Sequence, residues 1–165
     1  MSDKPLVSLI VGSASDESAM VSCRKALDAF GITHEARVLS AHRTADELVT
    51  YVKGLEPRGV KVVIAAAGMA AALPGVVAAY TRLPVLGVPL AAGALQGFDA
   101  LLAIAQMPGG VPVGCMAVGA AGGKNAAYLA ARILSLSDLT IRESLDKVVE
   151  ADKQAVLASS LSWEY

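Results

Sequence analysis

Short apolar runs alternate along the chain with longer runs of helical periodicity. The apolar runs predict strands at Leu6–Val11, Thr33–Leu39, Val60–Ala66, Val85–Val88 and Val113–Val118. The stretches between and after them predict helices at Asp16–Phe30, Thr44–Leu55, Gly97–Gln106, 122–134 and Asp138–Ser159, and one more helix that follows a Leu73-Pro74-Gly75 turn and ends near Thr81. Strict alternation of this kind is typical of a parallel sheet covered by helices on both faces. We therefore expect one domain over residues 1–165, a doubly wound α/β/α sandwich with an additional C-terminal helix.

Two long stretches of the chain, 62–81 and 100–123, contain no charged residue. Pro74 and Gly75 interrupt the first, and a Pro-Gly-Gly-Val-Pro segment interrupts the second. Uninterrupted membrane-spanning helices are unfavourable in such sequences. Val60–Ala66 instead has the continuous apolar character of a central strand that is buried on both faces.

Two polar turns follow predicted strands and precede predicted helices. The first is Gly12-Ser13-Ala14-Ser15-Asp16, and the second is Ser40-Ala41-His42-Arg43-Thr44. In an open α/β sheet, such strand-to-helix turns lie at one edge, where ligands bind. Together they indicate a site for a small phosphorylated substrate that undergoes proton transfer.

The first turn has both a structural and a functional interpretation. Ser13 and Asp16 are residue types that cap helices well. Alternatively, Ser13 and backbone amides hold a phosphate, because helix starts attract anions. Asp16 would repel a phosphate, so in that case it binds sugar hydroxyls.

The second turn contains one of only two histidines. Thr44 and Glu47 have the spacing of a capping box, which places His42 and Arg43 in the loop before the helix. An imidazole exchanges protons near neutral pH, and a guanidinium suits phosphate. His34, at the start of a strand, is predicted to be structural.

Composition narrows the classes of function. Net charge is −1 and the basic residues are scattered, so no nucleic-acid footprint is present. Charged residues make up only 18% of the chain, which favours a homo-oligomer over a lightly charged monomer. Cys23 and Cys115 form no disulfide or metal pattern, and the N-terminus lacks the order of a signal peptide. We expect a cytoplasmic protein that binds neither nucleic acid nor a membrane.

Several well-known ligand-binding and catalytic motifs are absent from the sequence or incomplete in it. The Gly119–Asn125 segment resembles a phosphate-binding P-loop, but it is one residue short and lacks Ser or Thr after Lys124. No Gly-x-Gly-x-x-Gly follows the first strand, no Gly-x-Ser-x-Gly is present, and histidines and carboxylates do not cluster.

The motifs in their order resemble the N5-carboxyaminoimidazole ribonucleotide mutase family, the catalytic-subunit type of phosphoribosylaminoimidazole carboxylase. Besides the two turns, the resemblance rests on four motifs: Gly68-x-Ala70-Ala71-x-Leu73-Pro74-Gly75, Pro84–Pro89, Gln106-Met107-Pro108-x-Gly110-x-Pro112-Val113 and Asn125-Ala126-Ala127-x-Leu129-Ala130-Ala131.

This resemblance implies a flavodoxin-like fold in a homo-octamer, with sites at subunit junctions and with no cofactor or metal. It implies transfer of a carboxylate from the exocyclic nitrogen to C4 of an aminoimidazole ribonucleotide in de novo purine (IMP) synthesis. His42 would be the general acid and base, and an ATP-dependent synthetase, to which the enzyme would be functionally coupled, would supply the substrate. The implied substrate-binding residues are Ser13, Asp16, Ser40, Arg43, Gly68, Ala70 and Leu73, and the Gly68–Gly75 loop and the Met107-Pro108 segment would enclose CO2.

One residue departs from the family pattern, which usually has His before Leu-Pro-Gly where this chain has Ala72. The branch that carboxylates aminoimidazole ribonucleotide directly usually has Lys after the motif's His, so Arg43 favours the mutase branch. Direct carboxylation, and a non-catalytic flavodoxin-like binding module, are the alternatives. The 138–165 segment is expected to pack on a neighbouring subunit, with Trp163 and Tyr165 docking, or to be a solvated tail.

Overall fold

The computed structural model describes residues 4–160. The predicted alternation of strands and helices is confirmed. The elements are β1 (Val7–Val11), η1 (Ala14–Asp16), α1 (Glu17–Ala29), β2 (His34–Val38), α2 (Ala45–Lys53), η2 (Glu56–Arg58), β3 (Val62–Gly68), α3 (Leu73–Tyr80), β4 (Val85–Leu90), α4 (Phe98–Ala105), β5 (Gly114–Cys115), α5 (Ala120–Leu134) and α6 (Leu139–Ala158).

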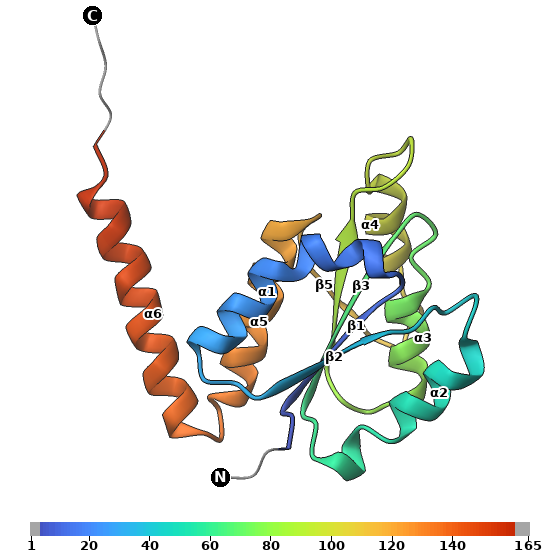
Figure 1. Ribbon diagram of the computed structural model, residues 1–165, viewed down its shortest axis with the longest axis horizontal. Coiled ribbons are helices and arrows are strands. Elements are labelled where there is room, and N and C mark those ends of the chain that lie inside the picture. Colours follow the sequence, from blue (N-terminus) through green and yellow to red (C-terminus); the bar gives the residue numbers. More distant parts are fainter. Residues whose placement is uncertain (1–3, 161–165) are drawn as a thin grey trace, which may run out of the picture.

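The strands form one parallel sheet in the order β2-β1-β3-β4-β5 (Figure 1). The chain passes from β1 outward to β2 and then returns across β1 to β3. The strand order therefore reverses between β1 and β3, which is the switch point where open α/β sheets bind ligands. This is the flavodoxin-like order that the family resemblance implies.

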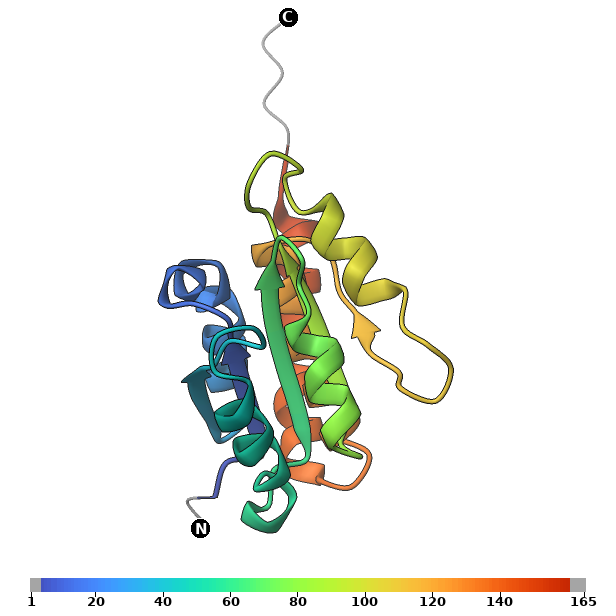
Figure 2. The ribbon, with the colours of Figure 1, turned by 90° about the vertical axis from the view of Figure 1, so that its right-hand side faces the viewer.

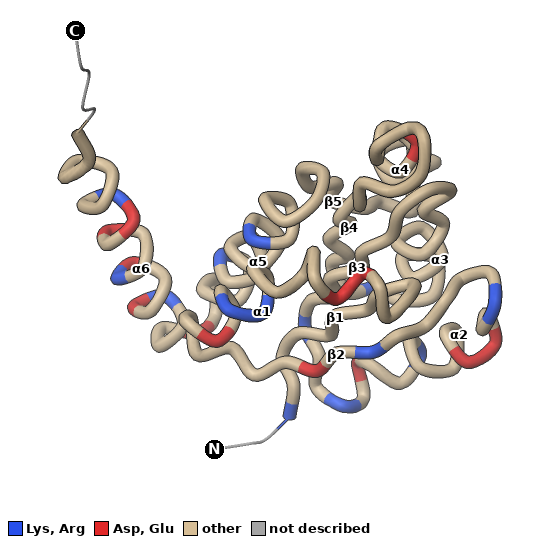
Figure 3. Tube along the Cα trace, turned by 45° about the horizontal axis from the view of Figure 1, so that its top comes forward, with Lys and Arg blue, Asp and Glu red and all other residues tan. Residues whose placement is uncertain are grey.

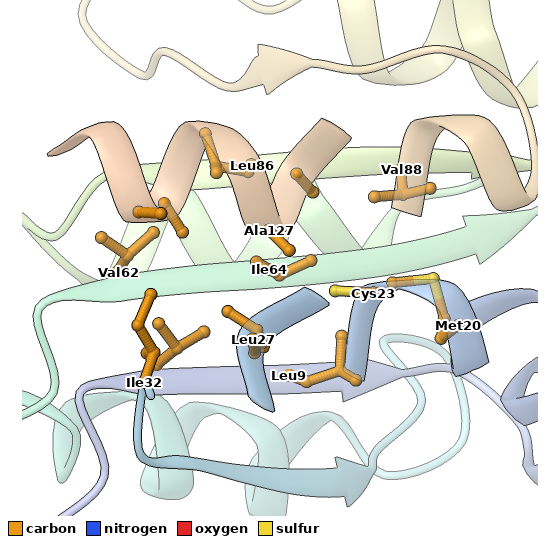
Figure 4. Packing of buried hydrophobic residues seen from close by; sticks show 14 of the residues in the cluster. Leu9, Met20, Cys23, Leu27, Ile32, Val62, Ile64, Leu86, Val88 and Ala127 are labelled. Atoms are coloured by element: carbon orange, nitrogen blue, oxygen red, sulfur yellow. The ribbon is translucent and has the colours of Figure 1, made fainter. Parts of the chain in front are cut away.

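Helices cover both faces of the sheet. On one face, α1 and α5 pack over Leu9, Ile64 and Leu86, with Leu27 and Ala127 closing the layer (Figure 4). On the other face, α2, α3 and α4 cover a second core (Figure 2). Successive residues of β3 point to opposite faces, so a strand at the centre of the sandwich must be apolar throughout. No helix in the described part of the chain is long and apolar enough to cross a membrane.

Two strand boundaries differ from the sequence prediction. The fifth strand, predicted over Val113–Val118, is only Gly114–Cys115, because this edge segment pairs with β4 alone. β4 continues past its predicted end at Val88 to Leu90, with Pro89 inside the strand. Pro89 has no N–H, but its carbonyl accepts a hydrogen bond from the amide of Gly119 at 2.8 Å.

A cluster of polar side chains joins β2, which precedes the second polar turn, to α2 and η2, which follow it. The carboxylate of Glu35 lies 2.7 and 2.8 Å from the guanidinium nitrogens of Arg58 and accepts a hydrogen bond from Tyr51 at 2.7 Å. The Tyr51 hydroxyl is also 2.8 Å from that of Ser8 in β1. Burial alone would raise the pKa of Glu35, but the hydrogen bonds from Arg58 and Tyr51 outweigh it and hold the pKa below its ordinary value.

The last helix, α6, lies outside α5 and extends away from the body of the molecule (Figure 1). Its buried residues, Ile141 and Leu145, both lie in its first half. Farther along, Tyr128 of α5 donates a 2.5 Å hydrogen bond to Asp152, and burial and this carboxylate raise the pKa of Tyr128 to about 12. Leu136, just before the helix, and Val156 and Leu157 near its end, remain exposed. Trp163 and Tyr165 lie outside the described residues.

The start of α5 offers a sharp test of packing. A Cβ added to Gly122 would lie 1.7 Å from the carbonyl oxygen of Ala117. Although Ala is the better helix former, we expect Gly122→Ala to lower the free energy of unfolding by about 3 kcal/mol. Urea denaturation measures this loss.

Gly123→Ala is the matched control on the same helix. The nearest atoms to its added Cβ would be the flexible Met20 Sδ, at 3.3 Å, and the Ala19 carbonyl oxygen, at 3.4 Å. We expect that variant to retain most of the wild-type stability. Equal stability of the two variants would contradict the packing described for Gly122.

Candidate active site

A cleft of about 510 Å³ opens at the carboxyl edge of the sheet. It is lined by the turns after β1 and β2, by the end of β3 and the loop that follows it, and by Ala92 after β4. All the site residues predicted from the sequence line this cleft: Ser13, Asp16, Ser40, His42, Arg43, Gly68, Ala70 and Leu73. Leu73 is only 2% exposed and belongs to the hydrophobic core, so its side chain forms part of the wall.

The turn after β1 is closed by its own side chains. The hydroxyl of Ser13 accepts hydrogen bonds from the backbone N–H of Ser15 at 3.3 Å and from the Ser15 hydroxyl at 3.0 Å. In return, the backbone N–H of Ser13 donates to the Asp16 carboxylate at 3.0 Å. The Ser13 hydroxyl keeps its own proton for a further acceptor, so the residue can cap the helix and still donate to a ligand.

Asp16 faces the cleft from the end of η1. Burial raises the pKa of its carboxyl above the ordinary value, and hydrogen bonds from the backbone amides of Ser13 and Gly12 oppose that rise. The backbone bond from Ser13 fixes one carboxylate oxygen. A carboxylate has about four acceptor sites, so Asp16 can still accept from a ligand hydroxyl.

The turn after β2 corrects one prediction. Thr44 occupies the N-cap position of α2, but its side chain makes no capping hydrogen bond, so the capping box with Glu47 is wrong. The Thr44 hydroxyl instead turns back to Ser40, accepting from its N–H at 2.9 Å and donating to its carbonyl at 3.1 Å. The backbone of Thr44, with φ −137° and ψ 50°, lies outside the extended conformation that is usual for a capping residue.

Hydrogen bonds to Ser40 fix the backbone of His42 and of the residue after it. The hydroxyl of Ser40 accepts hydrogen bonds from the backbone N–H groups of His42 and Arg43, at 3.3 and 3.2 Å. The His42 side chain is exposed to the cleft, and its imidazole has no hydrogen-bond or ion-pair partner among residues 4–160. His34 differs as predicted, because its Nδ1 lies 3.0 Å from the carbonyl of Ile32 at the start of β2.

Arg43 connects the two turns. One guanidinium nitrogen donates to the carbonyl of Gly12 at 3.1 Å, and Nε lies 3.5 Å from the Ser40 hydroxyl. Residues 31 positions apart in the sequence are thereby held together. A guanidinium has five N–H donors, so this arrangement leaves donors for an anion in the cleft.

The loop after β3 brings backbone close to backbone. A Cβ on Gly68 would lie 3.0 Å from Ala92 Cβ and 3.1 Å from the Leu90 carbonyl, so only glycine fits there without movement. The loop beyond Gly68 contains two residues with left-handed backbone conformations, Met69 with φ +54° and Ala71 with φ +42°. The sequence predicted that the Gly68–Gly75 loop as a whole lines the site, but it did not single out Met69 and it missed Ala92. Neither belongs to a residue type that indicates a site.

The Met107-Pro108 segment, expected to enclose CO2, is not part of the cleft within this chain. Met107 packs against the first turn of α3, where its Sδ lies 3.1 Å from the position of a Cβ on Gly75. Within the described ranges, no group of three or more His, Cys, Asp and Glu side chains is arranged to hold a metal ion.

A sequence model of the family described as AIR carboxylase matches residues 6–155. The N5-carboxyaminoimidazole ribonucleotide mutase of Bacillus subtilis is 50% identical over 157 residues, which cover 95% of this chain and 97% of that protein. A protein of the same description from Pyrococcus horikoshii is 44% identical over 168 residues, covering 99% and 94%. The chain belongs to the AIR carboxylase family.

The fold agrees with this assignment. The crystal structure of Treponema denticola PurE matches with a TM-score of 0.84 and 32% sequence identity, covering 93% of this chain and 94% of that one. The five-stranded parallel sheet and its flanking helices are therefore those of the family, and the family resemblance drawn from the sequence motifs is confirmed.

The turn that presents His42 depends on the Thr44 hydroxyl. We expect Thr44→Val, which keeps the shape and removes both hydrogen bonds to Ser40, to reduce the free energy of unfolding by about 1–2 kcal/mol. Thr44→Ser retains the hydroxyl and should remain within about 0.5 kcal/mol of the wild type. Chemical denaturation compares the three proteins, and a fully stable Val variant would show that the hydroxyl does not hold the turn.

Proposed function

We propose that the protein is an N5-carboxyaminoimidazole ribonucleotide mutase of de novo purine synthesis. The observation that supports this most directly is the imidazole of His42, which has no partner among residues 4–160 and stands in a cleft beside the Ser13 hydroxyl and the Arg43 guanidinium. The mutases of Bacillus subtilis and Pyrococcus horikoshii match nearly the whole chain. The substrate would be a ribonucleotide with a carboxylated amino group on an imidazole ring.

The polar side of the cleft suits the sugar phosphate. The Ser13 hydroxyl and the free donors of Arg43 would bind phosphate oxygens, since a guanidinium matches the geometry of that anion. The Asp16 carboxylate would accept hydrogen bonds from the ribose hydroxyls. The Ser40 hydroxyl already accepts hydrogen bonds from two backbone N–H groups of its own turn, so Ser40 would act by holding His42 in place.

The chemistry requires one proton to move between two atoms. As the bond between the exocyclic nitrogen and the carboxylate breaks, CO2 leaves and the nitrogen takes a proton from His42. C4 of the ring then attacks the retained CO2 and forms a carbon–carbon bond. His42 removes the proton from C4, which restores its own protonated form. Atoms and charges balance without a redox step, and the Gly68–Gly75 loop would retain the CO2.

The alternatives are less well supported. Direct carboxylation of aminoimidazole ribonucleotide would use the same cleft, but Arg43 and the Leu73-Pro74-Gly75 sequence favour the mutase branch. A flavin-binding module requires an aromatic partner for the flavin ring, and no Phe, Tyr or Trp occurs among the described residues that line the cleft. The expectations of no cofactor and of a cytoplasmic location, and functional coupling to the ATP-dependent synthetase, remain proposals.

His42→Asn tests the proposed role of the imidazole. We expect kcat to fall by at least about 100-fold, because asparagine cannot exchange the proton, while the ribonucleotide still binds. The assay supplies N5-carboxyaminoimidazole ribonucleotide, and a parallel assay supplies aminoimidazole ribonucleotide with bicarbonate. Turnover of the second substrate in preference to the first would favour the carboxylase, and undiminished turnover by the variant would remove His42 from the mechanism.

We also propose that the protein forms a homo-oligomer, an octamer if it follows the family. The α3 and α4 helices contain a single charged residue, Asp99, and Figure 3 shows this side of the molecule nearly free of charge. Phe98 is 61% exposed, and Leu95 and Leu102 are exposed near it. The exposed apolar residues at both ends of α6 would pack on a neighbouring subunit in the same assembly.

The mass of the particle in solution tests this assembly. We expect light scattering to give a multiple of the 16.8 kDa chain mass, and Phe98→Asp to produce a smaller species by burying a charge in the interface. Val21→Asp is the matched control, since Val21 is also exposed but lies on α1, across the sheet. A monomeric wild type would refute the proposal.

A further inference from the structure

Met69, the first residue after β3, has an unfavourable backbone conformation. Its φ of +54° lies in the left-handed region, where the Cβ of an L-residue is crowded and where glycine is the usual occupant. Such conformations persist only where the surrounding structure imposes them, and they concentrate at ligand sites. The position therefore requires an explanation for why it holds a long side chain.

Packing within the chain does not supply that explanation. The Met69 side chain is 61% exposed and belongs to neither hydrophobic core. Its Cγ lies 4.0 Å from the position that a Cβ on Gly93, in the loop after β4, would occupy. Because an exposed thioether gains little from folding, replacing Met69 with glycine should relieve strain without losing buried contacts.

The cleft itself provides a role for the side chain. The other described residues that line it are small, polar or charged, apart from Leu73, which is buried in the core. Met69 is thus the one large exposed apolar side chain among the described lining residues. It is carried by the β3–α3 loop, whereas Ser13 and Arg43 are carried by the turns after β1 and β2.

The proposed substrate has two ends of different chemistry. Its sugar phosphate is polar, and its aminoimidazole ring is planar with exposed π faces. A methionine sulfur makes favourable contacts with aromatic rings, and the flexible thioether adapts to the shape it meets. The lining therefore offers polar donors for one end of the ligand and a single thioether for the other.

We propose that Met69 is a specificity-determining residue that packs on the aminoimidazole ring of the bound ribonucleotide. This inference rests on the proposed function. The contact orients the ring relative to His42 and covers it from water. The strained backbone of residue 69 is thus retained for ligand binding, and the stability of the free protein would be greater with glycine there.

Calorimetric titration with two ligands tests this contact. The first is aminoimidazole ribonucleotide, which contains the ring, and the second is ribose 5-phosphate, which lacks it. We expect Met69→Ala to weaken binding of the ribonucleotide about fivefold and to leave ribose 5-phosphate unaffected. Met69→Leu should retain most of the affinity, because it keeps an apolar side chain of similar size.

Met69→Gly provides the matched control for the backbone. It should bind the ribonucleotide as weakly as Met69→Ala, yet unfold at a higher temperature, because glycine adopts the positive φ without strain. If both variants bind the ribonucleotide weakly but only Met69→Gly unfolds at a higher temperature, the loss of affinity comes from the missing side chain and not from a destabilised loop.

Three outcomes would overturn the inference. If Met69→Ala binds both ligands as the wild type does, Met69 makes no contact with the ring, and the mutase assignment is untouched. If the variant loses affinity for both ligands equally, Met69 has a structural role only. If the wild type binds ribose 5-phosphate and not aminoimidazole ribonucleotide, the proposed function fails, and this inference fails with it.

Discussion

The parallel pairing of β1 with both β2 and β3 is the constraint on which the cleft depends. Val11, the last residue of β1, is paired with Val38 on one side and Ala66 on the other. The three following segments therefore leave the sheet at nearly one level. Because the strand order reverses between β1 and β3, no helix fills the space above them, and the loops themselves form the walls.

The turns are then held by local hydrogen bonds that leave functional groups free. Ser13 and Asp16 close the first turn reciprocally, and Thr44 and Ser40 close the second. Arg43 joins the two through the Gly12 carbonyl. His42 contributes only its backbone N–H to these hydrogen bonds. The hydrogen-bonding groups that hold the turns therefore have partners, whereas the imidazole has none among residues 4–160. A polar group presented in this way is prepared for a ligand.

Much of this arrangement could be predicted because its causes are local. The apolar runs predicted the four longer strands, and the polar residues that follow two of those strands identified both turns. The predictions were wrong where neighbouring parts of the fold, and not the local sequence, determine the structure. Thr44 and Glu47 have capping-box spacing, but the Thr44 hydroxyl donates to the Ser40 carbonyl in the preceding turn and makes no capping bond. Val113–Val118 is apolar, but an edge position pairs only two of its residues.

By itself, the sequence determined the alternation of elements, the family and the chemical types of the site residues, since periodicity and motif order are properties of the chain alone. Only the tertiary structure decided which residues meet. It brought Arg43 to Gly12, buried Leu73 in the wall, and left Met69 exposed with a positive φ. Those outcomes depend on how strands and loops pack in three dimensions, and neither residue type nor spacing along the chain encodes a backbone angle imposed by distant neighbours.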